Sequence, residues 1–210
     1  MIEITSITDI KKHIQGLKAI VFDLDDTLYS EKEYVRSGFR AIADTLPQIK
    51  RMEEKLWQAF EQKKSAIDEV LTAEGMYTDE LKQNCLSVYR IQQPDIHLYE
   101  GAEELLGQFR ADGYQLGIIT DGRPEGQRAK IKALGLERLV DHIIVTDELG
   151  GVEYRKPNKA AFVKMKETLS VAFEEMCYVG DNIKKDFIAP ETLGIRAIHF
   201  LNADGLYINK

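Results

Sequence analysis

The chain has 210 residues, of which 44% are hydrophobic and 30% are charged. This length suits one well-buried core with a modest insertion, and the composition is that of a folded, water-soluble protein rather than a disordered or fibrous one. The net charge of -7 argues against nucleic acid and anionic membranes as partners, because both attract clustered Lys and Arg.

The amino-terminal stretch and the cysteines bear on location. Residues 1–16 contain charged side chains and no continuous apolar run, which is unlike a signal peptide or a membrane span. We therefore expect a cytoplasmic protein without membrane attachment. Cys85 and Cys177 lie far apart and belong to no paired metal-binding or redox pattern, so we expect free, reduced thiols.

Apolar runs alternate with helix-period segments along most of the chain. Thr8 or Asp9 can cap a short helix through residues 10–14, Gly16 ends it, and residues 19–22 form a buried-strand pattern. Later strands are predicted at residues 116–119, 143–145, 176–179 and 197–200, and helices at 102–109, 127–134, 159–169 and 187–193. This alternation predicts an α/β fold with a doubly wound parallel sheet, in which ligands bind beyond the carboxyl ends of the strands.

One stretch departs from the alternation. Residues 30–95 are rich in Glu, Lys and Gln, and their apolar residues fall at helical spacing without a persuasive strand. We expect a small α-helical insertion after the first core strand, with an apolar seam of Leu56, Phe60, Ile67, Val70 and Leu71. The predicted domains are a core of residues 1–29 and 96–210 and a helical domain of residues 30–95, while the tail from residue 202 has no assigned structure.

The densest acidic group is the run Asp23-Leu24-Asp25-Asp26-Thr27 at the exit of the first predicted strand. Carboxylates this close raise one another's pKa or require a cation, and oxygen ligands suit a hard ion such as Mg²⁺. Taken alone, the run fits a solvated turn with a helix cap equally well. The other strand ends decide between these two interpretations.

Three later strand exits carry complementary chemistry. The sequence Thr120-Asp121-Gly122 offers a hydroxyl and a loosened backbone that suit phosphate oxygens. Lys156 stands at a helix entry and can reach an anion, and Asp181 with Asp186 suggests a second metal-binding arm. Each feature alone has an ordinary structural explanation. Because the carboxyl ends of parallel strands meet at one edge of a sheet, their occurrence in this order predicts a single phosphate-processing site.

The order and spacing of these motifs resembles the haloacid dehalogenase superfamily, and in particular its C1-capped phosphatases. The resemblance covers essentially the whole chain and rests on matches to every motif of that family, namely Asp23, Asp25 and Thr27 in the first, Thr120 in the second, Lys156 in the third, and Asp181 and Asp186 in the fourth. It implies a Rossmann-like sheet, Mg²⁺-dependent phosphatase activity and a cap formed by residues 30–95.

The resemblance also implies catalytic roles. Asp23 is the nucleophile that forms an aspartyl-phosphate. Asp25 protonates the leaving alkoxide and then activates water, a double duty that needs a carboxyl whose pKa the site can raise. The Mg²⁺ ion is held by Asp23, the backbone carbonyl of Asp25 and Asp181.

Further residues are implied to bind phosphate or to support the site. The transferring oxygens are held by donors from two strand ends, namely Thr120, the amides near Asp121 and Gly122, and Lys156. Asp186 orients Lys156 or metal-bound water. Asp26 contributes its backbone amide rather than its carboxylate, and Thr27 braces the loop.

Several other functions compete with that of a phosphatase. A phosphomutase of the same family uses the same nucleophile, but mutase relatives usually have glycine where Asp26 stands. A dehalogenase does not need the acid/base Asp25. A receiver-like phosphoacceptor without turnover places its acceptor on a later strand and has no room for an insertion of this size, and a binding protein with a decayed site does not fit the intact motif set.

The expected substrate is a small phosphorylated metabolite, because the motifs bind the phosphoryl group that all candidates share. Sugar phosphates are our preferred class, with nucleoside monophosphates and phosphoglycolate as alternatives. Tyr29, Glu31, Tyr34 and Arg36 follow the first motif and are candidates to line the route between core and cap. The sequence favours neither a monomer nor a dimer.

Overall fold

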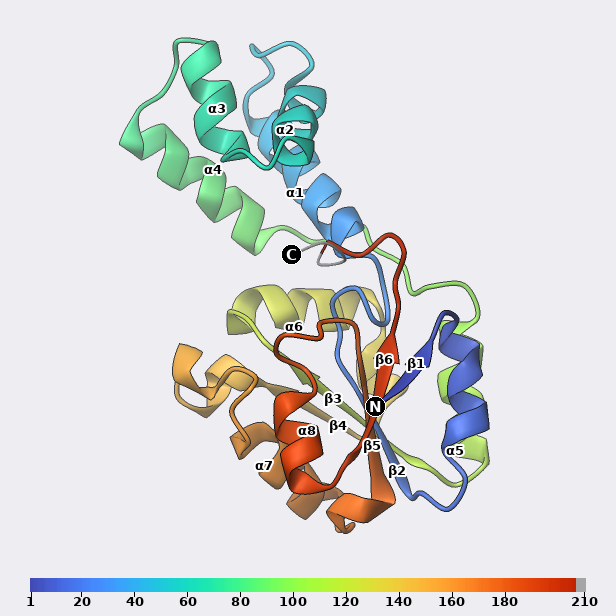
Figure 1. The fold of residues 1–210 in the computed structure, drawn as a ribbon. Helices are drawn as coiled ribbons and strands as arrows, with labels where there is room; N and C mark the ends of the chain where they lie inside the picture. Colours follow the sequence, from blue (N-terminus) through green and yellow to red (C-terminus); the bar gives the residue numbers. More distant parts are fainter. Residues whose placement is uncertain (207–210) are drawn as a thin grey trace. The chain divides into compact units, whose positions relative to one another are not determined.

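A computed structural model describes residues 1–206 of the chain (Figure 1). The chain divides into two compact units: Met1–Glu31 joined with the residues from His97 onward, and Lys32–Ile96. Our predicted boundaries fell after residues 29 and 95, whereas the structure divides the chain after Glu31 and after Ile96. The difference arises because Tyr29 pairs with Leu98 in an isolated β-bridge, which keeps the residues after the first core strand in the larger unit.

The larger unit is built on a six-stranded sheet in which every pairing is parallel. Its order is β1-β6-β5-β2-β3-β4, with the bounds β1 Ile2–Ile4, β2 Ala19–Phe22, β3 Gln115–Thr120, β4 His142–Val145, β5 Met176–Gly180 and β6 Arg196–Phe200. All residues of the central β2 are buried, as expected for a parallel strand covered on both faces. The prediction of a doubly wound α/β sheet is confirmed.

Four helices of the larger unit lie between the strands, namely α5 Ala102–Ala111, α6 Pro124–Ala133, α7 Ala160–Leu169 and α8 Ile188–Leu193. Figure 1 shows α5 and the pair α7 and α8 on opposite faces of the sheet. Short 3₁₀ helices complete the connections at Leu136–Arg138, Thr146–Leu149, Val152–Tyr154 and Phe173–Glu175. No helix among residues 1–206 is long and apolar enough to cross a bilayer.

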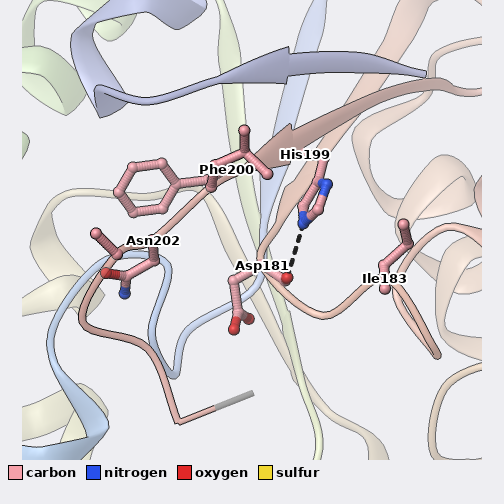
Figure 2. Close-up of a pocket in the computed structure, with 7 residues that line it drawn as sticks. Asp181, Ile183, His199, Phe200 and Asn202 are labelled. Carbon is pink, nitrogen blue, oxygen red and sulfur yellow. Dashed lines mark hydrogen bonds between the residues drawn. The ribbon is translucent and has the colours of Figure 1, made fainter. Parts of the chain in front are cut away.

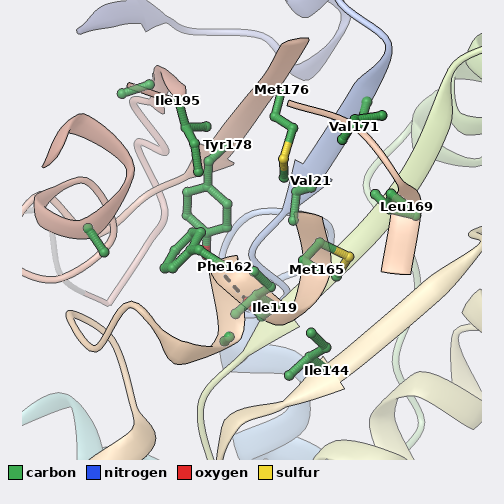
Figure 3. Close-up of a cluster of buried hydrophobic side chains, with 14 of the residues drawn as sticks. Val21, Ile119, Ile144, Phe162, Met165, Leu169, Val171, Met176, Tyr178 and Ile195 are labelled. Atoms are coloured by element: carbon green, nitrogen blue, oxygen red, sulfur yellow. Dashed lines mark hydrogen bonds between the residues drawn. The ribbon is translucent and has the colours of Figure 1, made fainter. Parts of the chain in front are cut away.

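The core beneath α7 fixes the central strands (Figure 3). Phe162 of α7 packs edge-on against Tyr178 of β5, with ring centroids 5.0 Å apart. A Cβ at Gly117 of β3 would lie 2.7 Å from the Met165 sulfur, so the absence of a side chain there lets α7 approach the sheet. Because each buried side chain of this size contributes about 1.5–3 kcal/mol, this packing holds the strand ends that carry the site.

The smaller unit is helical. It contains most of α1 Glu31–Thr45, together with α2 Met52–Glu61, α3 Ala66–Ala73 and α4 Asp79–Ile91. Leu56, Ile67, Val70 and Leu71 of the predicted seam are buried in its apolar core, and Phe60 packs partly buried against it. The helix α4 begins at a Thr78 cap, whose hydroxyl accepts a hydrogen bond from the Leu81 amide at 3.1 Å.

The structure corrects the reading of the amino terminus. The helix predicted through residues 10–14 is a 3₁₀ helix at Ile7–His13, preceded by Ser6 rather than capped by Thr8 or Asp9. Its buried residues Ile7 and Ile10 are three apart, which matches the tighter 3₁₀ period. The strand β1 was missed because three residues are too short a pattern to distinguish from a loop. Both cysteines are free and buried.

The tail from residue 202, which had no predicted structure, follows β6. Within the larger unit, residues 202–206 include turns at 203–204 and at 206, and residues 207–210 lie outside the described part of the chain.

Candidate active site

Asp23 follows the last residue of β2 and is 3% exposed. Its backbone amide donates to the Val179 carbonyl of β5 at 2.8 Å, so the loop leaves the sheet as a continuation of the central strand. The chain then turns tightly, because the amides of Thr27 and Leu28 both donate to the Leu24 carbonyl. This turn places the carboxylates of Asp23 and Asp25 at the carboxyl edge of the sheet.

Lys156 lies at the centre of the site with its side chain fully buried. Its ammonium nitrogen is 2.7 Å from Oδ1 of Asp23, 2.8 Å from Oδ1 of Asp186 and 2.8 Å from the Tyr178 hydroxyl. Burial opposes the charged form, but the carboxylates of Asp186 and Asp23 outweigh it and hold the pKa of Lys156 well above its usual value. The lysine is therefore a fixed positive charge beside Asp23.

Tyr178 connects this charge to the core. Its ring packs against Phe162, and its hydroxyl donates to the Ile119 carbonyl at 3.3 Å while accepting from Lys156. The apolar cluster thus determines where the lysine ammonium stands.

Asp186 is fully buried and both of its oxygens are engaged. Oδ1 lies 2.8 Å from the Lys156 ammonium in a close ion pair, without a hydrogen bond to it from the described residues. Oδ2 accepts from the Asn182 amide at 2.9 Å. The structure therefore places Asp186 beside Lys156, where it is shielded from solvent.

Asp181 lies at the exit of β5, and no cationic side chain among residues 1–206 forms an ion pair with it. Burial, followed by repulsion from Asp23 and Asp186, raises the pKa of Asp181 to about 8. Burial likewise raises the pKa of Asp23 to about 6, against the opposing charge of Lys156. Carboxylate oxygens of these three residues lie within 4.8 Å of one another, and such crowding of hard oxygen donors fits a divalent cation such as Mg²⁺. Asp23 and Asp181 are the two suited to hold it, because both oxygens of Asp186 are already engaged, one by Lys156 and the other by the Asn182 amide.

A pocket of about 280 Å³ opens beside Asp181 (Figure 2). Figure 2 shows the Asp181 carboxylate projecting into the space, and His199 of β6 hydrogen-bonded to the Asp181 carbonyl at 3.0 Å. The remaining walls are mainly apolar and come from Ile183 and from the end of β6, including Phe200. The hydrogen bond between His199 and the Asp181 carbonyl fixes the backbone at the exit of β5.

Asp25 is held by donors that the sequence analysis did not identify. Oδ1 accepts from the Tyr29 hydroxyl and from the Lys130 ammonium at 2.7 Å, and Oδ2 accepts from Gln127 at 2.9 Å. Burial raises the pKa of Asp25, but the Lys130 charge and the hydrogen bonds outweigh it, so that the pKa lies below its ordinary value. The expectation that the protein itself raises this pKa is therefore wrong, because a buried lysine faces the carboxylate.

The signal for these donors was present but weak. Gln127 and Lys130 are one helical turn apart in α6, directly after the predicted motif at residues 120–122, and both are nearly fully buried. A polar pair on the buried face of a helix needs polar partners. Without the sheet order, however, nothing in the sequence indicated that this face turns toward Asp25.

In the second motif, expected to offer donors to phosphate, the side chains of Thr120 and Asp121 are hydrogen-bonded within the protein. Thr120 is fully buried and its hydroxyl accepts from Gln127 at 2.5 Å. The Asp121 carboxylate accepts from the Lys156 amide, from Thr146 and from Lys185. Burial raises its pKa, but the charges of the two lysines hold it below its ordinary value. Asp121 therefore ties the three later loops together, while Gly122 adopts a φ of 143° that favours glycine.

Two loop residues differ from expectation. The Asp26 carboxylate, expected to play no part, accepts from the Glu31 amide at 2.9 Å and from the Leu206 amide at 2.7 Å. Thr27, expected to brace the loop, has a buried hydroxyl without a hydrogen-bond partner among the described residues. The bracing falls to Asp26 because its left-handed backbone, with φ 53°, directs its side chain back toward these amides.

Comparison with known proteins places the chain among enzymes. The model of a haloacid dehalogenase-like hydrolase matches residues 17–194. A glyceraldehyde 3-phosphate phosphatase from Methanocaldococcus jannaschii is 27% identical over 202 residues, covering 88% of this chain and 85% of the relative. A pyrophosphatase PpaX from Bacillus mycoides is 24% identical over 193 residues, or 87% and 82% of the two chains. A phosphoserine phosphatase from Thermus thermophilus is 34% identical over 101 residues, which is 48% of this chain and 39% of the relative.

Solved structures share the fold. A predicted phosphoglycolate phosphatase from Haemophilus somnus superposes with a TM-score of 0.65 at 20% identity, covering 94% of this chain and 90% of the other. A haloacid dehalogenase-like family hydrolase from Xanthomonas campestris superposes with a TM-score of 0.60 at 20% identity, covering 91% and 84%. At these identities the likeness extends to the fold alone.

Proposed function

The chain belongs to the haloacid dehalogenase-like hydrolase family, and on this premise we propose that it is a Mg²⁺-dependent phosphatase of small phosphate monoesters with Asp23 as nucleophile. The observation that carries the proposal is the buried contact of 2.7 Å between Lys156 and Asp23, with a carboxylate oxygen of Asp181 within 4.8 Å of one of Asp23. A carboxylate beside a fixed cation can receive a dianionic phosphate that a bare acidic cluster repels.

Mg²⁺ is proposed to be held by Asp23, Asp181 and the backbone carbonyl of Asp25. When bound, it neutralises the repulsion between anionic nucleophile and anionic phosphate. The raised pKa values of Asp181 and Asp23 support this assignment, because burial and the neighbouring carboxylates disfavour the charged forms that a bound cation would favour. Lys156 and the backbone near Gly122 are proposed to hold the phosphate oxygens.

The reaction is proposed to proceed in two displacements. A carboxylate oxygen of Asp23 forms a bond to phosphorus while the bond from phosphorus to the substrate's alkoxide breaks, and Asp25 gives its proton to that alkoxide. Asp25 then takes a proton from the water that attacks the phosphoryl group, releasing inorganic phosphate and the free Asp23 carboxylate. Because the free site lowers the pKa of Asp25, its proton is proposed to arrive with the substrate, whose negative charge raises that pKa.

We propose triose phosphates and similarly small phosphate esters as substrates. Support comes from the relatives named above, which act on small phosphorylated compounds, and from the helical unit Lys32–Ile96, whose insertion after the first motif fits the role of a cap that selects the substrate's organic part. The cytoplasmic location stays a prediction.

The test is phosphate release from a panel of small phosphorylated metabolites. We expect turnover with Mg²⁺, none after EDTA treatment, and none in Asp23→Asn. Asp112→Asn is the matched control, because Asp112 is an exposed carboxylate at the end of α5. Robust turnover by a folded Asp23→Asn protein would exclude Asp23 as nucleophile, and activity that survives metal removal would exclude the proposed cofactor.

A further inference from the structure

We propose that the segment Asn202–Leu206, which follows β6, is a positioning element that holds the catalytic loop through Asp26. The inference rests on the proposed function, because it assigns the segment a role in placing Asp25 and the metal. Every residue in the argument belongs to the larger unit.

Both polar atoms of the Asn202 side chain make hydrogen bonds in this segment. Its Nδ2 donates to the Asp26 carbonyl at 2.8 Å and to the Tyr99 hydroxyl at 2.7 Å. Its Oδ1 accepts from the Asp204 amide at 3.0 Å, which shapes the turn that follows. An exposed polar residue on a terminal segment does not need such a set of partners. The bonds therefore indicate a defined docking of the segment onto the loop.

The second attachment is at the Asp26 carboxylate, which is fully buried. Oδ2 accepts from the Leu206 amide at 2.7 Å, and Oδ1 accepts from the Glu31 amide at the start of α1 at 2.9 Å. A buried carboxylate that loses one of its donors bears a substantial desolvation cost. The carboxylate thus joins the carboxy-terminal segment to the chain immediately after the nucleophile.

The backbone of Asp26 shows what the attachment accomplishes. Its φ of 53° lies in the left-handed region, which a residue with a side chain occupies only when its surroundings impose it. Rotation about this φ swings the preceding peptide plane, which contains the Asp25 carbonyl proposed to face Mg²⁺. Holding Asp26 on both its carbonyl and its carboxylate therefore fixes the direction of that carbonyl and the position of the neighbouring Asp25 side chain.

The decisive experiment removes one backbone N–H donor without shortening the chain. Leu206→Pro deletes the amide donor to Asp26, whereas Leu206→Ala retains it and controls for the lost side chain. Asn202→Ala tests the other attachment, with the exposed Asn84 of α4 replaced in Asn84→Ala as the matched control. Each protein is assayed for kcat and KM of phosphate release, for Mg²⁺ affinity by calorimetry without substrate, and for melting temperature.

We expect Leu206→Pro and Asn202→Ala each to lower kcat roughly tenfold, the equivalent of one lost hydrogen bond, and to weaken Mg²⁺ binding several-fold. Leu206→Ala should lose much less, and Asn84→Ala should match the wild type. Should Leu206→Pro fail to fold, Asn202→Ala decides alone.

Equal behaviour of Leu206→Pro and Leu206→Ala would overturn the proposal, as would a lower melting temperature with unchanged kcat and Mg²⁺ affinity, which indicates a purely structural role. Failure of the proposed function is distinguishable: the wild type then releases no phosphate from any substrate, while the calorimetric comparison of Mg²⁺ affinity still tests the segment.

Discussion

Replacing Asp181, a proposed metal ligand, should stabilise the protein in the absence of metal. In Asp181→Asn the side chain keeps its shape and loses its charge. The pKa of Asp181 is raised from 3.8 to about 8, mainly by burial and then by repulsion from Asp23 and Asp186. Between these two pH values the folded protein therefore holds a proton on Asp181 that the unfolded chain has lost, and the contribution of Asp181 to stability is fully present below pH 3.8 and is lost as pH rises toward 8.

The size of the effect follows from this interval. Each pH unit between the two pKa values removes about 1.36 kcal/mol, so the full shift sets an upper bound of roughly 6 kcal/mol. Because Asp181 is only partly buried and water screens its charge, we expect about 2–3 kcal/mol. For a chain of this length that corresponds to a rise in melting temperature of about 5–10 °C.

The assay is thermal unfolding of EDTA-treated protein at pH 4.5 and pH 8.5. The advantage of Asp181→Asn over the wild type should be smallest at the acidic pH and largest at the alkaline one, and added Mg²⁺ should stabilise the wild type but not the variant. Asp112→Asn serves as control and should show no such pH dependence. An Asp181→Asn protein that melts below the wild type at pH 8.5, or a difference independent of pH, would refute the reasoning.

Three further substitutions test the supports of the site. Lys130→Met should destabilise the protein by about 1.5–3 kcal/mol at neutral pH, because Asp25 loses its charged donor. Since the pKa of Asp25 is lowered from 3.8, this loss of stability should shrink as pH falls through the lowered pKa. Urea unfolding at several pH values measures both effects. Tyr178→Phe removes one partner of Lys156 and should lower kcat up to about tenfold in phosphate-release assays. Met165→Ala should lower the free energy of unfolding by about 2–5 kcal/mol in the same urea experiments, because it leaves a cavity under the sheet.

Lys130→Met has a matched control, and each of the three substitutions has an outcome that would contradict its reasoning. Lys132→Met changes an exposed lysine of α6 and should leave unfolding unaltered at every pH. If it matches Lys130→Met, the loss reflects helix propensity rather than the contact with Asp25. Full activity in Tyr178→Phe would show that the carboxylates alone position Lys156, and a fully stable Met165→Ala would show that the core collapses into the space.

The sequence predicted the strand ends well because their chemistry is local. Asp23, Thr120, Lys156 and Asp181 each follow a short apolar run, and the rules of parallel sheets bring the ends of such runs to one edge. The structure brings these four residues together there. Their catalytic roles stay proposals, but their meeting at one edge follows directly from the alternation of strands and helices.

What the sequence did not predict depends on long-range geometry. Whether Lys130 faces Asp25 depends on the rotation of α6 against the sheet, which no local periodicity determines for a helix of mixed polarity. The carboxylate of Asp26 was assigned no part because its partners, Glu31 and Leu206, differ so widely in sequence separation. Sequence patterns reveal interactions between residues that are close along the chain, whereas a hydrogen bond between residues 180 positions apart produces no such pattern.

The short edge strand β1 connects the two ends of the described chain, because it pairs with β6. Ile4 is paired with Phe200 of β6, and the Leu201 amide donates to the Ile4 carbonyl at 2.8 Å, one residue before Asn202. Peptide or protein fusions that disturb β1 would therefore loosen the strand that carries the Asp26 attachment. A purification tag joined next to β1 is therefore expected to lower activity if it disturbs the pairing of β1 with β6.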